Sequence, residues 1–198
     1  MPVAPVPAPA GATTGPDPSE RMMQLSFGYM ASASIQIAAK LKIADFLANG
    51  PKDVHELAIA TGTHEDRLYR ILRLLASLGV FSEATPRTFA LTPAAEILRS
   101  DVPNSFRDMA LWITSPFHFR TYAELMHSVK TGEITFDHVH GKPIFEFLPE
   151  NPELSELFNN GMTCLSKVVT PALLEAYDFA GIHTLMDVAG GHGALLRA

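Results

Sequence analysis

The stretch THEDRLYRILRLLASLGV, residues 63–80, decides how the first half of this chain is expected to fold. Thr63 and Asp66 have the spacing of a capping box, which is typical of a helix start. The apolar residues after them recur at helical spacing and form one stripe, at Leu68, Ile71, Leu72, Leu75 and Leu78. The pattern predicts an amphipathic helix that packs this stripe onto a core.

The segments around this helix complete a larger unit. Before it, DVHELAIATG at 53–62 predicts a short helix ending near Gly62. After it, VFSE at 80–83 and RTFALT at 87–92 predict two short strands joined by a turn, and another helix starts at Thr92-Pro93. Helix, turn, helix and a two-stranded wing together predict a winged helix.

A winged helix can bind DNA or serve as a packing scaffold. Arg67, Arg70 and Arg73 could contact phosphates or bases in the major groove. However, Glu65 and Asp66 stand on the leading turn, and the chain carries a formal charge of −6. Phosphate binding needs a basic surface, so these residues favour a scaffold that binds no nucleic acid. A DNA-binding regulator stays open as the alternative.

Residues 19–48 predict helices that carry apolar residues on nearly all sides. Such helices are not stable alone in water, so they are either covered by the rest of the chain or buried against a second copy, and we expect the second copy. With the winged helix they would form a dimerisation domain over residues 17–100. The preceding MPVAPVPAPAGATTGP, residues 1–16, is expected to be a disordered Pro/Ala tail.

The rest of the chain changes character near residue 183. Residues 101–182 predict linking helices, with starts at Ser115-Pro116 and Asn151-Pro152. Residues 182–188 then predict a buried core strand. The expected fold is therefore mainly α, followed over 183–198 by the first strand, turn and helix of a Rossmann-like α/β domain.

Composition narrows the class of protein. An apolar content of 47% and a charged content of 18% indicate a globular chain. The single cysteine, Cys164, excludes an internal disulfide and a multi-cysteine zinc site, so a reducing cytoplasm is expected. No run of apolar residues is long enough to predict a membrane span, and the N-terminus lacks the pattern of a secretory signal.

The final stretch LMDVAGGHGALLRA, residues 185–198, contains a glycine turn. A dinucleotide fingerprint would place a glycine three residues after Gly193, where the chain has Leu196. The turn suits a ligand whose flank approaches bare backbone, such as the amino-acid end of S-adenosylmethionine. From these residues alone, a simple connection without a ligand remains equally open.

The order of these segments resembles the S-adenosylmethionine-dependent small-molecule O-methyltransferases, including enzymes of the caffeate, acetylserotonin and hydroxyneurosporene type and bacterial polyketide-tailoring relatives. The resemblance rests on PIFEFLPENPE at 143–153, LFNNGMTCLSKVVTPALLEAYDFAGIHTLMDVAGGHGALL at 157–196, and the winged helix before them. It covers residues 20–198. It implies an intertwined homodimer whose winged helix does not bind DNA.

The resemblance also implies where an acceptor would bind. The segment with Phe158, Met162 and Leu165 matches a helix that lines the acceptor pocket, and Phe117 and His118, with the adjacent Phe119, are expected to face the acceptor. Aromatic and thioether walls suit a flat aromatic acceptor. Phe158 and Met162 are also four residues apart, so a plain helix-core role remains open.

The same resemblance implies the cofactor contacts. Ser166 matches a position that touches S-adenosylmethionine in relatives. The first cofactor motif is matched by Asp187, Ala189, Gly190, Gly191 and Gly193. Relatives usually have glycine at the position of Ala189, and alanine can replace it unless its φ is positive.

The catalytic group is expected elsewhere. In relatives, the histidine that serves as general base lies beyond the position of Ala198, and His183 and His192 do not match it. The pair His138 and His140 predicts a solvated loop and no metal site. We therefore expect the N-terminal part of a longer, truncated methyltransferase, inactive alone, with a non-catalytic dimerisation partner as a further alternative.

Overall fold

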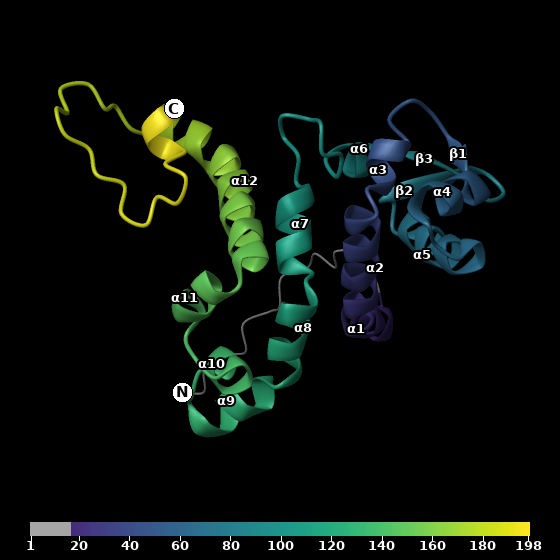
Figure 1. Cartoon of the computed structure of the whole chain (residues 1–198), viewed down its shortest axis with the longest axis horizontal. Coiled ribbons are helices and arrows are strands. Elements are labelled where there is room, and N and C mark those ends of the chain that lie inside the picture. The colour runs from purple at the N-terminus through teal and green to yellow at the C-terminus, as the bar shows by residue number, and fades with distance from the viewer. Residues whose placement is uncertain (1–16) are drawn as a thin grey trace, which may run out of the picture.

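The computed structural model describes residues 17–198, so the tail predicted over residues 1–16 lies outside the described part. Figure 1 shows an N-terminal unit of helices and a small sheet on one side and α12 (Pro152–Ala176) on the other. Between them lies α7 (Arg107–Ile113), which packs along both α12 and α2 (Gly28–Lys40). This arrangement places the end of the chain beside α12.

The N-terminal unit contains the elements predicted over residues 53–100, in the predicted order. They are α4 (Val54–Thr61), α5 (Glu65–Ser77), β2 (Phe81–Thr85), β3 (Thr88–Leu91) and α6 (Pro93–Glu96). A short strand that was not predicted, β1 (Lys52–Asp53), joins them, and the antiparallel sheet has the order β1-β3-β2.

The start of α5 differs from the prediction. His64 is the N-cap, with no side-chain hydrogen bond to the helix. The Thr63 hydroxyl instead lies 2.9 Å from the hydroxyl of Thr61, on the turn that Gly62 makes with a φ of 63°. The capping box predicted from Thr63 and Asp66 is therefore wrong, because the turn after α4 takes Thr63 out of capping position.

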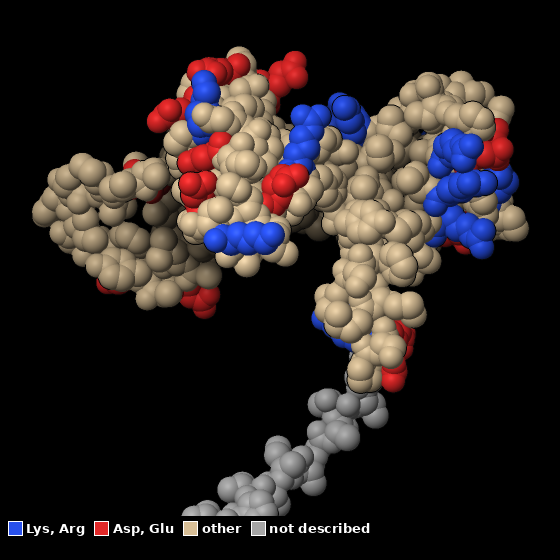
Figure 2. Space-filling view, turned by 90° about the horizontal axis from the view of Figure 1, so that it is seen from below, with Lys and Arg blue, Asp and Glu red and all other residues tan. Residues whose placement is uncertain are grey.

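Charged residues gather at the end of the molecule formed by α5 and the sheet. Figure 2 shows Lys and Arg side chains on this end with acidic side chains beside them. Arg87, on the turn between β2 and β3, donates hydrogen bonds to Glu65 and Asp66 at the start of α5. The hydrogen bonds to Arg87 and His55 lower the pKa of Glu65, so this surface is a mixed network of both signs.

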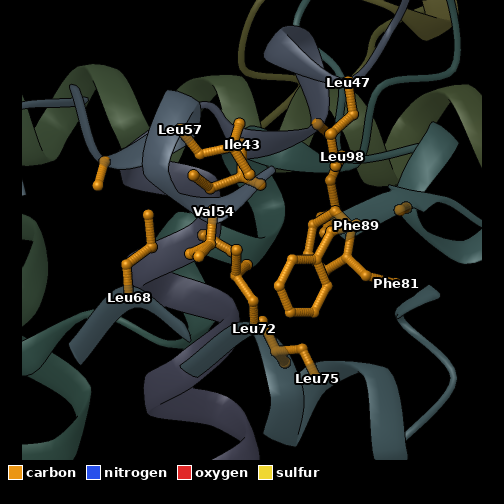
Figure 3. Packing of buried hydrophobic residues seen from close by; sticks show 14 of the residues in the cluster. Ile43, Leu47, Val54, Leu57, Leu68, Leu72, Leu75, Phe81, Phe89 and Leu98 are labelled. Atoms are coloured by element: carbon orange, nitrogen blue, oxygen red, sulfur yellow. The ribbon is translucent and has the colours of Figure 1, made fainter. Parts of the chain in front are cut away.

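One hydrophobic core holds this unit together. Figure 3 shows side chains from α3 (Ile43–Phe46), α4, α5 and the strands pointing toward one another. Of the predicted α5 stripe, Leu68, Leu72 and Leu75 are buried. Leu78 is 52% exposed because α5 ends at Ser77, so the residue leaves the helical stripe. Phe81 and Phe89 close the core from the sheet side.

The predicted N-terminal helices form α1 (Pro18–Ser26) and α2, with Phe27 between them. The Asp17 side chain caps α1 and accepts from the Ser19 backbone N–H at 2.8 Å. No residue of α1 is buried. Exposed apolar side chains cover this part of the chain: Met22, Met23, Leu25, Phe27, Tyr29 and Met30.

The linking segment is helical as predicted. It contains α7, α8 (Pro116–Ala123), α9 (Leu125–Thr131), α10 (Thr135–His140), α11 (Ile144–Phe147), the 3-10 turn η1 (Leu148–Glu150) and α12. α12 comes close to α7 at Gly161, where a Cβ would lie 3.5 Å from Cβ of Trp112. Within residues 17–198, no helix combines the length and the apolar composition needed to cross a membrane.

The strand predicted over residues 182–188 does not form. Residues 178–194 contain neither strand nor helix, and only the 3-10 turn η2 (Leu195–Arg197) follows the glycines. A parallel strand needs neighbours for its backbone hydrogen bonds. The strands within residues 17–198 all belong to the N-terminal sheet, so this segment has no ladder to join. The predicted strand and α-helix over 183–198 are therefore wrong for this structure, whereas the glycine turn between them forms.

Candidate functional site

A cavity of about 470 Å³ lies between α12 and the glycine turn. Its volume falls within the range of about 300–1,000 Å³ that small-molecule sites usually have. Figure 1 shows the last segment leaving α12 and returning so that the C-terminus lies beside that helix. The cavity thus has one wall from residues 158–173 and another from residues 187–195, with Phe145 of α11 at its edge.

The first wall is one face of α12. Phe158, Met162, Val169 and Leu173 follow one another at intervals of four, seven and four residues, which keeps them on one side of a helix. Leu165 also lines the cavity and is 50% exposed. The structure therefore brings together the three α12 residues for which an acceptor role is predicted.

Trp112 supports this wall from behind. Its ring centroid lies 5.1 Å from that of Phe158, in an edge-on arrangement. Trp112 and Met109 are buried against α12 in a second hydrophobic cluster that includes Leu148. Phe158 and Met162 pack partly against this cluster and also line the cavity. Both readings left open for Phe158 and Met162, core and cavity wall, thus describe part of their surroundings.

The second wall is the glycine turn, which presents Asp187, Ala189, Gly190 and Gly191. The Gly193 backbone N–H donates to the Gly190 carbonyl at 2.8 Å and closes the turn. A Cβ on Gly190 would lie within 3.0 Å of the Asp187 carboxyl atoms. Only a residue without a side chain lets the carboxylate lie over the turn in this way.

Ala189 is strained. Its φ is 62°, in the left-handed region where a side chain costs about 1–2 kcal/mol. Alanine can replace the glycine of the expected cofactor motif without strain only if its φ is not positive. The φ of Ala189 is positive, so this turn carries a backbone strain that glycine would remove.

Ser166 is a predicted cofactor residue that lies on α12 and not in the glycine turn. It lines the cavity, and its hydroxyl donates to the Met162 carbonyl at 3.0 Å. A hydroxyl has a single proton, so this bond leaves its lone pairs for a ligand donor. Ser166 can therefore accept a hydrogen bond from a ligand without losing its bond within α12.

Of the other predicted site residues, all of them within the described part of the chain, Phe117, His118 and Gly193 lie outside the cavity lining. Phe117 and His118 pack on Trp112 instead, with ring centroids 5.8 Å and 4.6 Å from it. The indole thus stands between these rings and Phe158.

His118 makes the fold sensitive to acid. Burial is the main reason why the pKa of His118 lies below its ordinary value of 6.5. The unfolded chain therefore binds this proton at a higher pH than the folded chain does. We therefore expect the contribution of His118 to the free energy of unfolding to be fully present above about pH 6.5 and to fall as the pH drops below it, because protonation favours the unfolded state.

We expect His118→Asn to reduce this loss, since the amide does not titrate and can keep the 3.0 Å bond from Nδ1 to the Ser115 hydroxyl. The measurement is the free energy of urea unfolding at pH 7.5 and 5.5. Burial also lowers the pKa of His140, so part of the acid sensitivity should remain. The exposed His183 gives the control His183→Asn. An equal pH dependence in wild type and His118→Asn would contradict the assignment.

The histidine pair of residues 138 and 140 lies in α10, not in the predicted loop. His138 stacks on His127 with ring centroids 3.7 Å apart, and His140 packs against Phe117 and Phe136. Both histidine rings therefore contact other rings, which a solvated loop would not provide. Among residues 17–198, no group of three or more His, Cys, Asp or Glu side chains is placed to hold a metal ion.

Several residues that line the cavity were not predicted as site residues, and Thr163 and His192 are the most important of them. The Thr163 hydroxyl lies 2.9 Å from Nδ1 of His192, across the cavity walls. Thr163 belongs to a polar row of α12 at spacings of four, three and four residues: Asn159, Thr163, Ser166 and Thr170. Helical periodicity could have found this row once the helix bounds were known.

Two family models match the chain. The O-methyltransferase dimerisation domain matches residues 23–101, and the O-methyltransferase domain matches residues 122–198. Together they cover most of the N-terminal unit, α9 to α12 and the glycine turn, whereas α7 and most of α8 lie between the two matches.

Individual proteins agree with these matches. The phenazine O-methyltransferase PhzM of Lysobacter antibioticus is 39% identical over 180 residues, which cover 91% of this chain and 52% of that protein. The solved structure of LaPhzM has a TM-score of 0.86 at 39% identity and is matched over 90% of this chain and 53% of its own. The S-adenosylhomocysteine-bound structure of CalO1, a methyltransferase in calicheamicin biosynthesis, has a TM-score of 0.76 at 32% identity, over 92% of this chain and 55% of its own. The chain spans about half the length of these relatives.

Proposed function

The chain belongs to the O-methyltransferase family, and on that premise we propose that it binds S-adenosylmethionine and a small aromatic hydroxyl compound in one cavity. The reaction would transfer a methyl group from the cofactor to a phenolic or enolic oxygen. The observation that carries this proposal is the cavity between α12 and the glycine turn. Its opposite walls contain the predicted acceptor residues Phe158, Met162 and Leu165 and the predicted cofactor residues Asp187 and Ala189 to Gly191.

The residues of the glycine-turn wall fit the cofactor. When bound, S-adenosylmethionine supplies a methyl group on a positively charged sulfur, and it carries an ammonium group at its amino-acid end. Asp187 is the one acidic residue in the cavity lining of the described chain, and its charge complements a cation. Ser166 offers a hydroxyl acceptor. The glycines let backbone groups approach the ligand closely.

The residues of the α12 wall fit a flat acceptor. The face of Phe158 and the thioether of Met162 form apolar contacts with an aromatic ring. Trp112 holds Phe158 from behind, which limits the positions that the acceptor can take. We propose that Phe117 and His118 act on the acceptor side only through Trp112, because they contact its ring rather than the cavity.

No lining residue matches the general base that the family resemblance assigns. We propose that this base lies in the part of the relatives' length that the chain does not span. The 198 residues alone should then bind cofactor without turnover.

We further propose that residues 17–100 are a winged-helix dimerisation unit that joins two copies of the chain. The support is the match to a dimerisation domain and the exposed apolar side chains of α1 and the start of α2. A continuous apolar surface of this kind marks an interface.

The dimer proposal predicts the molecular mass of the protein in solution. Sedimentation equilibrium should give about twice the 21.5 kDa of one chain, and Leu25→Glu should shift the protein toward the monomer. Ile59→Glu is the control, because this apolar residue of α4 is also exposed and lies outside α1 and α2; it should leave the dimer intact. A monomeric wild type would disprove the proposal.

The alternative of a DNA-binding regulator has weaker support. The arginines of α5 are exposed, but Glu65 and Asp66 occupy the leading turn and bind Arg87. The segment that contains them also matches a dimerisation domain of methyltransferases.

The experiment that tests the function is a calorimetric titration of the 198-residue chain with S-adenosylhomocysteine. We expect saturable binding near one ligand per chain. A dinucleotide such as NAD is the matched control and should not bind, because the glycine of its fingerprint is replaced by Leu196. Absence of saturable binding of S-adenosylhomocysteine would overturn the cofactor site proposed for this chain.

A further inference from the structure

Within residues 17–198, a single hydrogen bond ties the glycine turn to the preceding part of the chain. Thr163 on α12 and His192 in the turn are 29 residues apart in sequence, and Oγ1 of the threonine lies 2.9 Å from Nδ1 of the histidine. Both residues line the cavity. The other hydrogen bonds of the turn join residues close together in the chain, such as the bond from the Gly193 N–H to the Gly190 carbonyl.

The direction of this hydrogen bond follows from the second partner of Thr163. Its hydroxyl donates to the Asn159 carbonyl one helical turn earlier, at 2.9 Å. Because a hydroxyl has only one proton, the same oxygen must accept the bond from His192. The proton of the neutral His192 ring therefore lies on Nδ1. The nitrogen left for a ligand is Nε2, an acceptor.

The position of the turn depends on this bond, because residues 17–198 lack a paired strand before the glycines that would hold the turn in place. In the described part of the chain, no strand pairs with residues 182–188. Among residues 17–198, no other hydrogen bond joins residues 178–198 to the preceding part of the chain. In the described part of the chain, this is therefore the one point at which hydrogen bonding fixes the turn that carries Asp187 and the glycines against α12.

We propose that Thr163 is a positioning residue of the cavity. Its hydroxyl accepts the Nδ1–H of His192, fixes the tautomer of that ring and holds the glycine turn opposite α12. The effect on cofactor affinity rests on the proposed function, whereas the tautomer and the order of the turn do not. Thr163 thereby couples the wall that faces the acceptor to the wall that faces the cofactor.

The test compares Thr163→Val with Thr163→Ser. Valine keeps the shape of threonine but removes the hydroxyl, and serine keeps the hydroxyl. Long-range proton–nitrogen NMR spectra report the His192 tautomer, and heteronuclear NOE values of the Gly190, Gly191 and Gly193 amides report the order of the turn. We expect the Nδ1–H tautomer in wild type and Thr163→Ser. Thr163→Val should lose that preference and show lower NOE values at the glycines.

Thr121 offers a matched control. Its hydroxyl also donates to a carbonyl one turn earlier, that of Phe117, and lies 3.1 Å from Nε2 of His140, away from the cavity. Thr121→Val should leave both the His192 tautomer and the glycine NOE values unchanged. S-adenosylhomocysteine affinity should fall about three- to tenfold in Thr163→Val, the effect of losing one hydrogen bond, and should stay unchanged in Thr121→Val.

Two results would overturn the proposal: an Nε2–H tautomer of His192 in wild type, or glycine NOE values that do not respond to Thr163→Val. If wild type binds no S-adenosylhomocysteine, the proposed function fails, and the two ligand-free NMR measurements still decide the role of Thr163.

Discussion

Phe89→Ala is expected to lower the free energy of unfolding by about 3–5 kcal/mol, the usual cost of emptying a buried phenylalanine site. Phe89 is completely buried and lies in β3, the central strand of the sheet. Its backbone position pairs with Lys52 of β1 and Glu83 of β2, so the ring stands where both edge strands meet the helices. Figure 3 shows the Phe89 side chain close to Phe81 and to the leucine side chains of α5.

A loss of this size removes a large share of the roughly 5–15 kcal/mol that stabilises a typical domain. Urea unfolding at one fixed protein concentration measures it, because the proposed dimer would make stability depend on concentration. Phe145→Ala is the matched control, since Phe145 is 73% exposed at the edge of the cavity. It should cost less than about 1 kcal/mol. Equal losses of unfolding free energy for the two variants would contradict the role of Phe89 as a buried core residue.

Gly190→Ala is expected to weaken S-adenosylhomocysteine binding by about tenfold to a hundredfold, as the loss of a hydrogen bond to a charged group would. The new Cβ would lie within 3.0 Å of the Asp187 carboxyl atoms. The φ of Gly190 is not positive, so its backbone tolerates alanine. The carboxylate is the end of a rotatable side chain and can move away. The fold should therefore survive while Asp187 loses its place over the turn.

The opposite change at the neighbouring residue is the control. Ala189→Gly removes a methyl group at a φ of 62° and relieves strain, so binding should be kept or strengthened. Calorimetric titrations of the two variants, with thermal unfolding to confirm that each is folded, make the comparison. Unchanged affinity in Gly190→Ala would mean that Asp187 does not contact the cofactor.

Residues 53–100 show which parts of the fold can be predicted from local sequence. The spacing of Leu68, Leu72 and Leu75 and the turn residues between the strands predicted the helices and the hairpin in the right order. Helical periodicity and turn chemistry act over a few residues, so they can be read along the chain. The same reasoning missed β1, because its two residues are strand only through pairing with Phe89 and Thr88.

Residues 182–188 show where local sequence stops being sufficient. Their apolar composition is that of a buried strand, yet they form none, and Met186 and Val188 are more than 80% exposed. A strand exists only when a neighbouring strand supplies hydrogen bonds. That condition belongs to the surroundings of the segment and not to the segment itself.

The family resemblance, and not local spacing, pointed to α12 and the glycine turn as the proposed acceptor wall and cofactor turn. The sequence by itself determined the helical character and the order of the N-terminal elements. These follow from periodicity, caps and glycines, which act within one or two helical turns. Only the tertiary structure decided that α12 and the glycine turn enclose one cavity and that Thr163 and His192 join its walls. It also decided that Phe117 and His118 contact Trp112 instead. Such contacts depend on how packed helices bring together residues far apart in the chain, and local spacing carries no information about that distance.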